Sequence, residues 1–292
     1  MEAVQKTYTY YCWKIYKITM KKYVTRTISG TIFATILIVA AQSKWSLLGI
    51  LMVFGFVCLF EFNKLIEQRN RLSYLIFAAL YFAFGFVGIF FKKGNGINEA
   101  SQILHVVTVF VLLFLIRDLF SSKSLPKLLT NRYINTTFYI SSGVVFLLLI
   151  AYNFGNYSPN TIVGMFTLIW LNDSFAYLIG TNFGKQKLFE SVSPKKTVEG
   201  FLGGVFFAAL GSYFIFKFTA ELEFSSWLII SVIVSIFGTI GDLIESKYKR
   251  QAAVKDSGRL IPGHGGLLDR LDSAIFVSPF IYLFLRILNY VS

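Results

Sequence analysis

The chain has 292 residues, of which 55% are hydrophobic and only 15% charged, and its 28 Lys and Arg against 15 Asp and Glu give a net charge of +13. Ordinary soluble domains carry about 25% charged residues, and a soluble protein with this many Phe, Leu and Ile would expose large apolar patches. This composition excludes a disordered chain, and with only Cys12, Cys58, His105 and His264 it also excludes a disulfide scaffold and a Cys/His zinc site. It indicates an all-α, polytopic integral membrane protein with positive charge available for anionic partners.

The first 27 residues form an arm rich in Lys and aromatic side chains. The arm lacks the apolar centre and the small-residue cleavage site of a signal peptide. Two explanations stay open: the arm lies on anionic lipid, or Met20, followed by Lys21, Lys22 and the first span, is the true start. We prefer the second explanation.

About nine apolar segments are long enough to cross a bilayer of about 30 Å, which takes roughly 20 residues each. They lie at 28–43, 45–62, 74–91, 103–120, 134–152, 161–180, 198–218, 226–245 and 271–290. We expect 28–160 to form an N-terminal transmembrane bundle and 161–292 to form a catalytic transmembrane region.

The basic residues predict the orientation of these spans. Most Lys and Arg lie in the N-terminal arm and in every second connection, and short loops rich in Lys and Arg stay on the cytoplasmic side. We therefore expect a multi-pass protein of the inner membrane with its N-terminus and active-site loops in the cytoplasm. Nine spans would place the C-terminus outside, and an even number would place it inside.

The sixth predicted span contains a carboxylate within the sequence Asn172-Asp173-Ser174. A charged group inside a membrane helix is costly, so it typically faces a polar cavity and marks function. The alternative is a hydrogen bond between packed helices.

The connection 181–200 gathers groups that bind anions. After the turn at Ser193-Pro194, the residues Lys195, Lys196 and Thr197 come directly before a helix that contains glycine. Cations, a hydroxyl and the free N–H groups of a helix N-terminus together make a phosphate site. A solvated loop that only sets the topology is the alternative.

Acidic residues flank a glycine-rich loop in the stretch 238–273. Asp242, Glu245 and Lys249 share one face at the end of the eighth span, and Asp269 and Asp272 share a face where the last span begins. The loop between them contains Lys255, Asp256, Gly258, Gly263, His264, Gly265 and Gly266. Carboxylates at two helix ends beside such a loop suit a divalent cation that holds phosphates, and oxygen ligands favour Mg²⁺. The alternative is an ordinary charged loop at the membrane surface.

At these residues the chain resembles the phosphatidate cytidylyltransferases, or CDP-diacylglycerol synthases. The family's C-terminal signature stands here as Ser246, Lys249-Arg250, Lys255-Asp256, Gly258, Ile261-Pro262, His264-Gly265-Gly266 and Asp269-Arg270-Leu271-Asp272, with Tyr248 as the one departure. The likeness spans roughly residues 170–280, whereas the N-terminal half agrees only in hydropathy.

The resemblance implies transfer of CMP from CTP to phosphatidate, which gives CDP-diacylglycerol and pyrophosphate. It also implies Mg²⁺, with Asp242 and Asp269 at the positions of the two acidic metal ligands. Potassium as a second cation is implied by the family alone. The expected partners are CTP, phosphatidate and the lipid bilayer, with no nucleic acid; a homodimer is left open.

Under this hypothesis the remaining polar residues divide into three roles. Asp173 and Asp256 support the metal site, and His264 binds phosphate or orients an Asp. The phosphate-binding cations are Lys195, Lys196, Lys249, Arg250, Lys255 and Arg270, and the substrate-binding set also includes Asp173, Ser193, Thr197, Gly265, Gly266 and Asp272.

Two other functions fit parts of the pattern. A CTP-dependent kinase of a polyprenol would also have basic loops and a metal site, but it would need to activate a neutral hydroxyl. An anion transporter typically has interrupted helices in two related halves, whereas polarity in this chain is confined to the C-terminal half.

Overall fold

The computed structural model describes residues 24–87, 95–121, 132–152, 156–219, 221–263 and 265–291. Within these ranges, eight helices are long and apolar enough to cross a membrane. They are Val24–Ala41, Lys44–Leu65, Glu99–Leu119, Arg132–Ile150, Pro159–Phe183, Val198–Thr219, Phe224–Gln251 and Leu268–Tyr290. The prediction of an all-α polytopic membrane protein is therefore confirmed.

The third predicted span, 74–91, corresponds to a shorter apolar helix, Leu72–Phe86. Its last predicted residues lie outside the described ranges, as does most of the N-terminal arm. The count of nine spans, and with it the side of the membrane that holds the C-terminus, stays a prediction.

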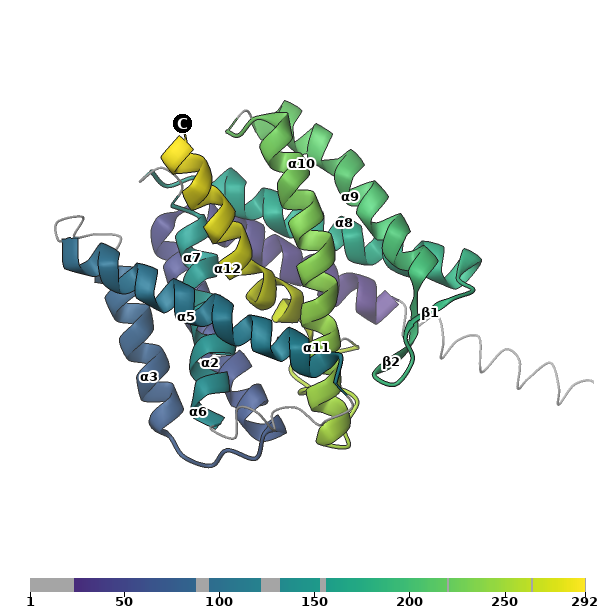
Figure 1. The fold of residues 1–292 in the computed structure, drawn as a ribbon, viewed down its shortest axis with the longest axis horizontal. Helices are drawn as coiled ribbons and strands as arrows, with labels where there is room; N and C mark the ends of the chain where they lie inside the picture. The colour runs from purple at the N-terminus through teal and green to yellow at the C-terminus, as the bar shows by residue number, and fades with distance from the viewer. Residues whose placement is uncertain are drawn as a thin grey trace, which may run out of the picture.

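The elements follow the predicted order along the chain (Figure 1). After the helix Val24–Ala41 they are α2 (Lys44–Leu65), α3 (Leu72–Leu80), η1 (Tyr81–Val87), α5 (Asn95–Leu119), α6 (Arg132–Ile134), η2 (Asn135–Ser141), α7 (Ser142–Ile150), α8 (Pro159–Phe183), β1 (Lys187–Phe189), β2 (Ser193–Thr197), α9 (Val198–Thr219), α10 (Phe224–Ile233), η4 (Val234–Gly238), α11 (Thr239–Gln251) and α12 (Leu268–Val291).

The elements η1, η2 and η4 are π-helical: η1 follows α3, η2 lies between α6 and α7, and η4 lies between α10 and α11. Elements α10, η4 and α11 together form one span. Single π-helical turns are frequent next to functional sites, because the extra residue re-aims the side chains that follow. The turn η4 ends four residues before Asp242. It therefore helps to set the direction in which the acidic face of α11 points.

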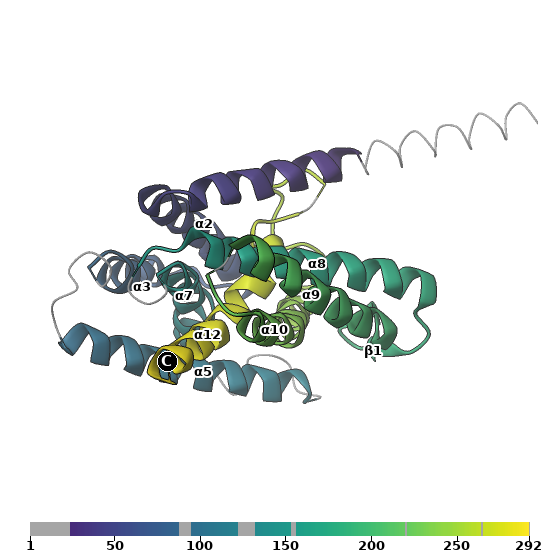
Figure 2. The same cartoon turned by 90° about the horizontal axis from the view of Figure 1, so that it is seen from above.

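Helices α8 and α9 lie side by side and antiparallel, as both ribbon views show (Figures 1 and 2). Glycines on α9 allow this approach: a Cβ atom at Gly203 would collide with Ile179, and one at Gly204 would lie 2.7 Å from Asn172 Oδ1. Small residues at helix contacts are typical of membrane bundles, where close packing replaces the hydrophobic effect. This pair forms one wall of the site described below.

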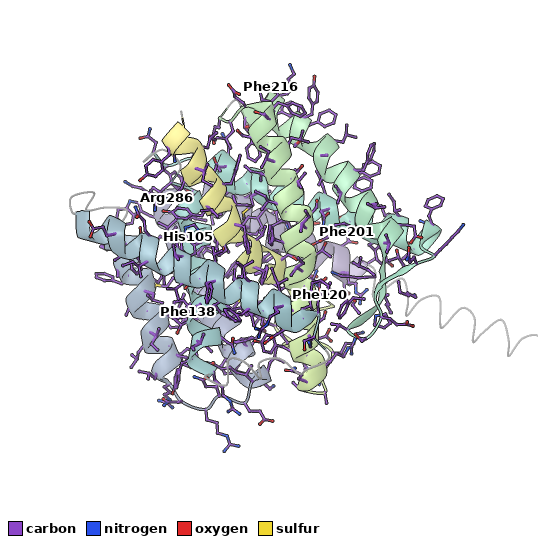
Figure 3. All side chains as sticks on the ribbon, viewed as in Figure 1. His105, Phe120, Phe138, Phe201, Phe216 and Arg286 are labelled. Atoms are coloured by element: carbon purple, nitrogen blue, oxygen red, sulfur yellow. The ribbon has the colours of Figure 1, made fainter. Side chains whose placement is uncertain are left out.

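Helix α12 lies at the centre of the bundle and packs against α7, η4 and α11. At the α7 contact, a Cβ atom at Gly143 would lie 2.6 Å from the Ile275 carbonyl oxygen. Inside α12, the Pro279 carbonyl lies 2.8 Å from His105 Nε2 of α5, and the His105 ring also contacts Phe146 and Tyr282. His105, labelled in Figure 3, is thus a core histidine with a structural hydrogen bond.

The connection between α8 and α9 contains a short antiparallel hairpin, β1 and β2, in which Lys187 pairs with Thr197 and Phe189 with Ser193. This hairpin was not predicted, because the sequence of the connection indicated only turns and a helix start. Just before the hairpin, the backbone N–H groups of Lys185 and Gln186 donate to the Glu199 carboxylate in the first turn of α9, at 3.0 Å and 3.1 Å. These bonds fold the connection back onto the helix end.

The first described helix runs along one edge of the bundle, opposite α5 (Figure 2). It contacts the connection between α11 and α12, residues 252–267, which we call the glycine loop. Arg26 Nε donates to the Gly263 carbonyl at 2.9 Å, and Ser29 Oγ donates to the Pro262 carbonyl at 3.0 Å. The N-terminal bundle therefore touches the region in which the motifs are concentrated.

Candidate functional site

A cavity of about 680 Å³ lies between α8, the hairpin, α9, α11 and α12. Its wall includes Asp173, Lys195, Lys196, Thr197, Asp242, Lys249, Asp256, Asp269, Arg270 and Asp272, all of which were predicted from the sequence. Lys187 is a further cation in the wall. The tertiary structure thus brings three stretches that are far apart in the sequence to one polar cavity at one end of the membrane helices.

Three carboxylates form a compact group in this region. One oxygen each from Asp242, Glu245 and Asp272 lies within 4.8 Å of the others. Glu245 is fully buried, and within the described residues no hydrogen-bond donor reaches its Oε1 atom. Buried carboxylate oxygens require a partner, and three hard oxygen donors at this spacing fit a Mg²⁺ ion that completes its shell with water and phosphate oxygens.

These three carboxylates are not the same set as Asp242 and Asp269, the pair of metal ligands that the family resemblance implied. Asp242 belongs to the three, but its companions are Glu245 and Asp272, whereas Asp269 is occupied by other contacts. Asp269 as a metal ligand stays a prediction. Glu245 shares the face of α11 that was recognised in the sequence, since it lies one turn from both Asp242 and Lys249.

Asp269 accepts hydrogen bonds from the glycine loop. Its Oδ2 atom receives Ser257 N at 2.9 Å, Ser257 Oγ at 2.9 Å and Gly266 N at 2.7 Å. Gly265 has a φ of 91°, a left-handed conformation that glycine adopts without a steric penalty. Asp269 therefore holds the loop in its shape while its other oxygen, Oδ1, pairs with Lys249.

Lys249 connects the two acidic helix ends. Its Nζ lies 2.5 Å from Glu245 Oε2 on its own helix and 2.7 Å from Asp269 Oδ1 on α12. Only 13% of the Lys249 side chain is exposed, so solvent screens these ion pairs weakly. The ammonium compensates part of the concentrated negative charge.

Lys196 crosses the cavity from the hairpin to α11, where its Nζ lies 2.6 Å from Asp242 Oδ2. Burial by itself lowers the pKa of Lys196, but the attraction and hydrogen bond of Asp242, together with the charges of Asp173 and Asp272, outweigh it and raise the pKa above its ordinary value. Lys196 therefore keeps its positive charge at neutral pH and beyond.

The N-terminus of α9 closes the cavity beside the hairpin. Thr197 is buried, and its Oγ1 accepts a hydrogen bond from Gly200 N at 3.1 Å, which is the usual role of a helix N-cap. A Cβ atom at Gly180 would lie 3.0 Å from the same oxygen. The predicted order of Lys195, Lys196 and Thr197 before a helix N-terminus is therefore present.

Five predicted site residues lie outside the cavity wall in the part of the chain that the structure describes: Ser193, Arg250, Lys255, Gly265 and Gly266. Ser193 pairs with Phe189 in the hairpin. Arg250 Nε donates to the Val192 carbonyl at 3.4 Å, and Lys255 is exposed. His264 lies outside the described residues.

Glu61 of α2 was missed in the sequence analysis. Its side chain is buried, and its Oε2 atom accepts hydrogen bonds from Leu268 N at 2.8 Å and from Ser257 Oγ at 3.2 Å. The sequence carried a signal for it, because Glu61 is a carboxylate inside an apolar span, the feature that singled out Asp173.

A model of the cytidylyltransferase family matches residues 20–288. A phosphatidate cytidylyltransferase of Staphylococcus saprophyticus is 34% identical over 246 residues, which cover 81% of this chain and 90% of the relative. A phosphatidate cytidylyltransferase of Staphylococcus epidermidis is 32% identical over the same share. A phosphatidate cytidylyltransferase of Bacillus subtilis is 45% identical over 139 residues, 47% of this chain and 51% of the relative.

Proposed function

This chain belongs to the cytidylyltransferase family, and we propose that it transfers CMP from CTP to phosphatidate, giving CDP-diacylglycerol and pyrophosphate. The observation that carries the proposal is the polar cavity among membrane helices, whose wall holds five carboxylates and five Lys or Arg side chains. A cavity of this composition suits two polyanionic reactants, one of which stays anchored in the bilayer.

The cations of the cavity fall into two groups. Lys196 and Lys249 pair with carboxylates, whereas Lys187, Lys195 and Arg270 make no salt bridge with a described carboxylate. The second group is therefore available for phosphate oxygens. Arg270 suits bidentate hydrogen bonding to a phosphate group because its guanidinium is planar, whereas the lysines act as point charges.

Asp242, Glu245 and Asp272 would hold Mg²⁺, since their oxygens lie close together and no described hydrogen-bond donor reaches the buried Glu245 Oε1. When bound, this ion would offset triphosphate charge and stabilise the pyrophosphate leaving group. Lys249 pairs with both Glu245 and Asp269 and so holds these two carboxylates in place.

The lipid substrate explains why a strong general base is unnecessary. A phosphomonoester has a second pKa near 6 and is already largely ionised at neutral pH. The side chains of the cavity therefore need to align the lipid phosphate with the α-phosphorus of CTP and to neutralise charge. We assign this work to Lys187, Lys195 and Arg270, which make no salt bridge with a described carboxylate.

We further propose that the protein lies in the inner membrane and that its cavity opens on the cytoplasmic side. The hairpin and the glycine loop that border it carry basic residues, which favour the cytoplasmic side. CTP would then enter from the cytosol while the acyl chains remain in lipid. A soluble enzyme would instead have to extract them, at about 0.8 kcal/mol per CH₂.

The test uses the purified protein in detergent with phosphatidate and CTP labelled either at the α- or at the γ-phosphate, with and without Mg²⁺. We expect the α-label to appear in the lipid and pyrophosphate to be released only when phosphatidate is present. Transfer of the γ-label to a lipid would instead identify a lipid kinase, and absence of any lipid-dependent turnover would refute an enzymatic role in this reaction.

A further inference from the structure

Glu61 lies near the C-terminal end of α2, outside the stretch that carries the motifs. A carboxylate there is unfavourable for two reasons: it is 5% exposed within an apolar bundle, and the C-terminal end of a helix carries partial negative charge. The compensation comes from another part of the chain. Leu268 N, the first residue of α12, donates to Glu61 Oε2 at 2.8 Å, so the carboxylate lies at a favourable helix N-terminus.

Two glycines of the loop leave room for this side chain. A Cβ atom at Gly258 would collide with the Glu61 carboxylate, and the three nearest atoms to it all belong to Glu61. A Cβ atom at Gly266 would lie 2.5 Å from Glu61 Oε2 and would also collide with Ser257 Oγ. Glycine at both positions is thus required by the close approach of Glu61.

Ser257 links Glu61 to the cavity. Its hydroxyl lies 3.2 Å from Glu61 Oε2 and 2.9 Å from Asp269 Oδ2. A hydroxyl has one hydrogen and can donate to only one of them at a time, so the backbone N–H groups supply the remaining bonds. Ser257 N bonds Asp269, and Leu268 N bonds Glu61. Glu61 therefore holds the start of α12 through Leu268 N and shares the Ser257 hydroxyl with Asp269.

On the basis of the proposed CMP transfer, we propose that Glu61 is a positioning residue for this reaction: its carboxylate fixes Ser257 and the start of α12, and thereby the places of Asp269 and Arg270 in the cavity. Glu61 does not line the cavity within the described residues. Its effect on turnover passes through the loop, because displacement of a catalytic group by about 1 Å is enough to slow a reaction about 100-fold.

The experiment compares Glu61→Ala and Glu61→Gln with Glu67→Gln, a control near the same helix end whose side chain is exposed. The readouts are kcat, KM for CTP, and the rate at which trypsin cuts the ligand-free protein after Lys255 and Arg259, both exposed on the loop. For Glu61→Ala we expect kcat to fall about 10- to 100-fold, KM to change little, and tryptic cleavage of the loop to accelerate. Glu61→Gln keeps an oxygen acceptor and should lie between Glu61→Ala and wild type.

A double-mutant cycle separates positioning from a general loss of stability. Gly258→Ala should lower kcat about tenfold in the wild-type background, because misplaced groups cost turnover. It should have little further effect with Glu61→Ala, because the carboxylate that it would strike is gone; such non-additivity is expected only between residues in contact. Additive losses, or a folded Glu61→Ala protein with wild-type kcat and wild-type cleavage, would overturn the proposal.

If Glu61→Ala gives no folded protein, Glu61→Gln becomes the test variant. A Glu61→Gln protein with the kcat and the tryptic cleavage rate of wild type would equally overturn the proposal. If the wild-type protein shows no CMP transfer, the proposed function fails. The cleavage rates of the ligand-free variants still test the anchoring of the loop, so the two failures are distinguishable.

Discussion

Replacement of Asp269 by Asn removes one charge from the most heavily bonded carboxylate of the site. The side chain is 5% exposed. One oxygen accepts three hydrogen bonds from Ser257 and Gly266, and the other lies 2.7 Å from Lys249 Nζ. Asn has a single oxygen acceptor, so if that oxygen keeps the three loop donors, its NH₂ group must face the Lys249 ammonium.

The cost follows from these contacts. A hydrogen bond to a charged group contributes about 1.5–3 kcal/mol, and Asp269→Asn loses the bond to Lys249 and weakens the three others. Lys249 keeps Glu245 at 2.5 Å, which prevents the larger penalty of an unpaired buried cation. We expect the free energy of unfolding to fall by roughly 2–3 kcal/mol, and kcat for CMP transfer to fall by about 100-fold or more, because the geometry of the loop and Lys249 changes together.

The assay is CMP transfer from α-labelled CTP to phosphatidate, run beside a thermal melt of the same detergent-purified protein. Glu223→Gln serves as the control, because Glu223 is exposed and its side chain makes no capping hydrogen bond. A folded Asp269→Asn protein with activity within about twofold of wild type would refute the role given to this carboxylate, since even one lost charged hydrogen bond corresponds to a larger factor.

Three further outcomes are expected. Glu245→Gln should raise the Mg²⁺ concentration needed for half-maximal activity at least about tenfold, because it removes one of three clustered carboxylates; an unchanged Mg²⁺ titration would exclude Glu245 from the metal site. The pKa of Lys196 is raised above its ordinary value of 10.5, so its ion pair with Asp242 should contribute fully at every pH below about 10.5 and be lost only above it. Any fall in wild-type activity between pH 8 and 9 should therefore persist unchanged in Lys196→Arg. Disappearance of that fall in the variant would show that Lys196 loses its charge in this pH range and would contradict the raised pKa. Gly143→Ala should lower the melting temperature, by an amount that corresponds to about 1–3 kcal/mol of overpacking, because the new methyl group would press on the Ile275 carbonyl; KM for CTP should stay unchanged, and a variant as stable as wild type would show that α7 and α12 can separate.

Local pattern predicted those features that depend on neighbours in the chain. The apolar runs marked the membrane helices, because a helix in lipid satisfies its own backbone groups and needs only apolar side chains. Helical spacing placed Glu245 and Lys249 on one face, where they form an ion pair. The order of Lys195, Lys196 and Thr197 before a helix also came from adjacent residues, and Thr197 caps α9.

Only the tertiary structure decided which of these groups meet. Asp272 joins Asp242 and Glu245, Lys196 reaches Asp242 from the hairpin, and Glu61 contacts a loop about 200 positions further along the chain. Nothing in the spacing of a sequence specifies such contacts, because they depend on how close two helices approach and at what angle. In this bundle, glycines such as Gly203, Gly204 and Gly258 allow the close approaches. The sequence alone determined which chemical groups are present, and packing determined which carboxylates lie together.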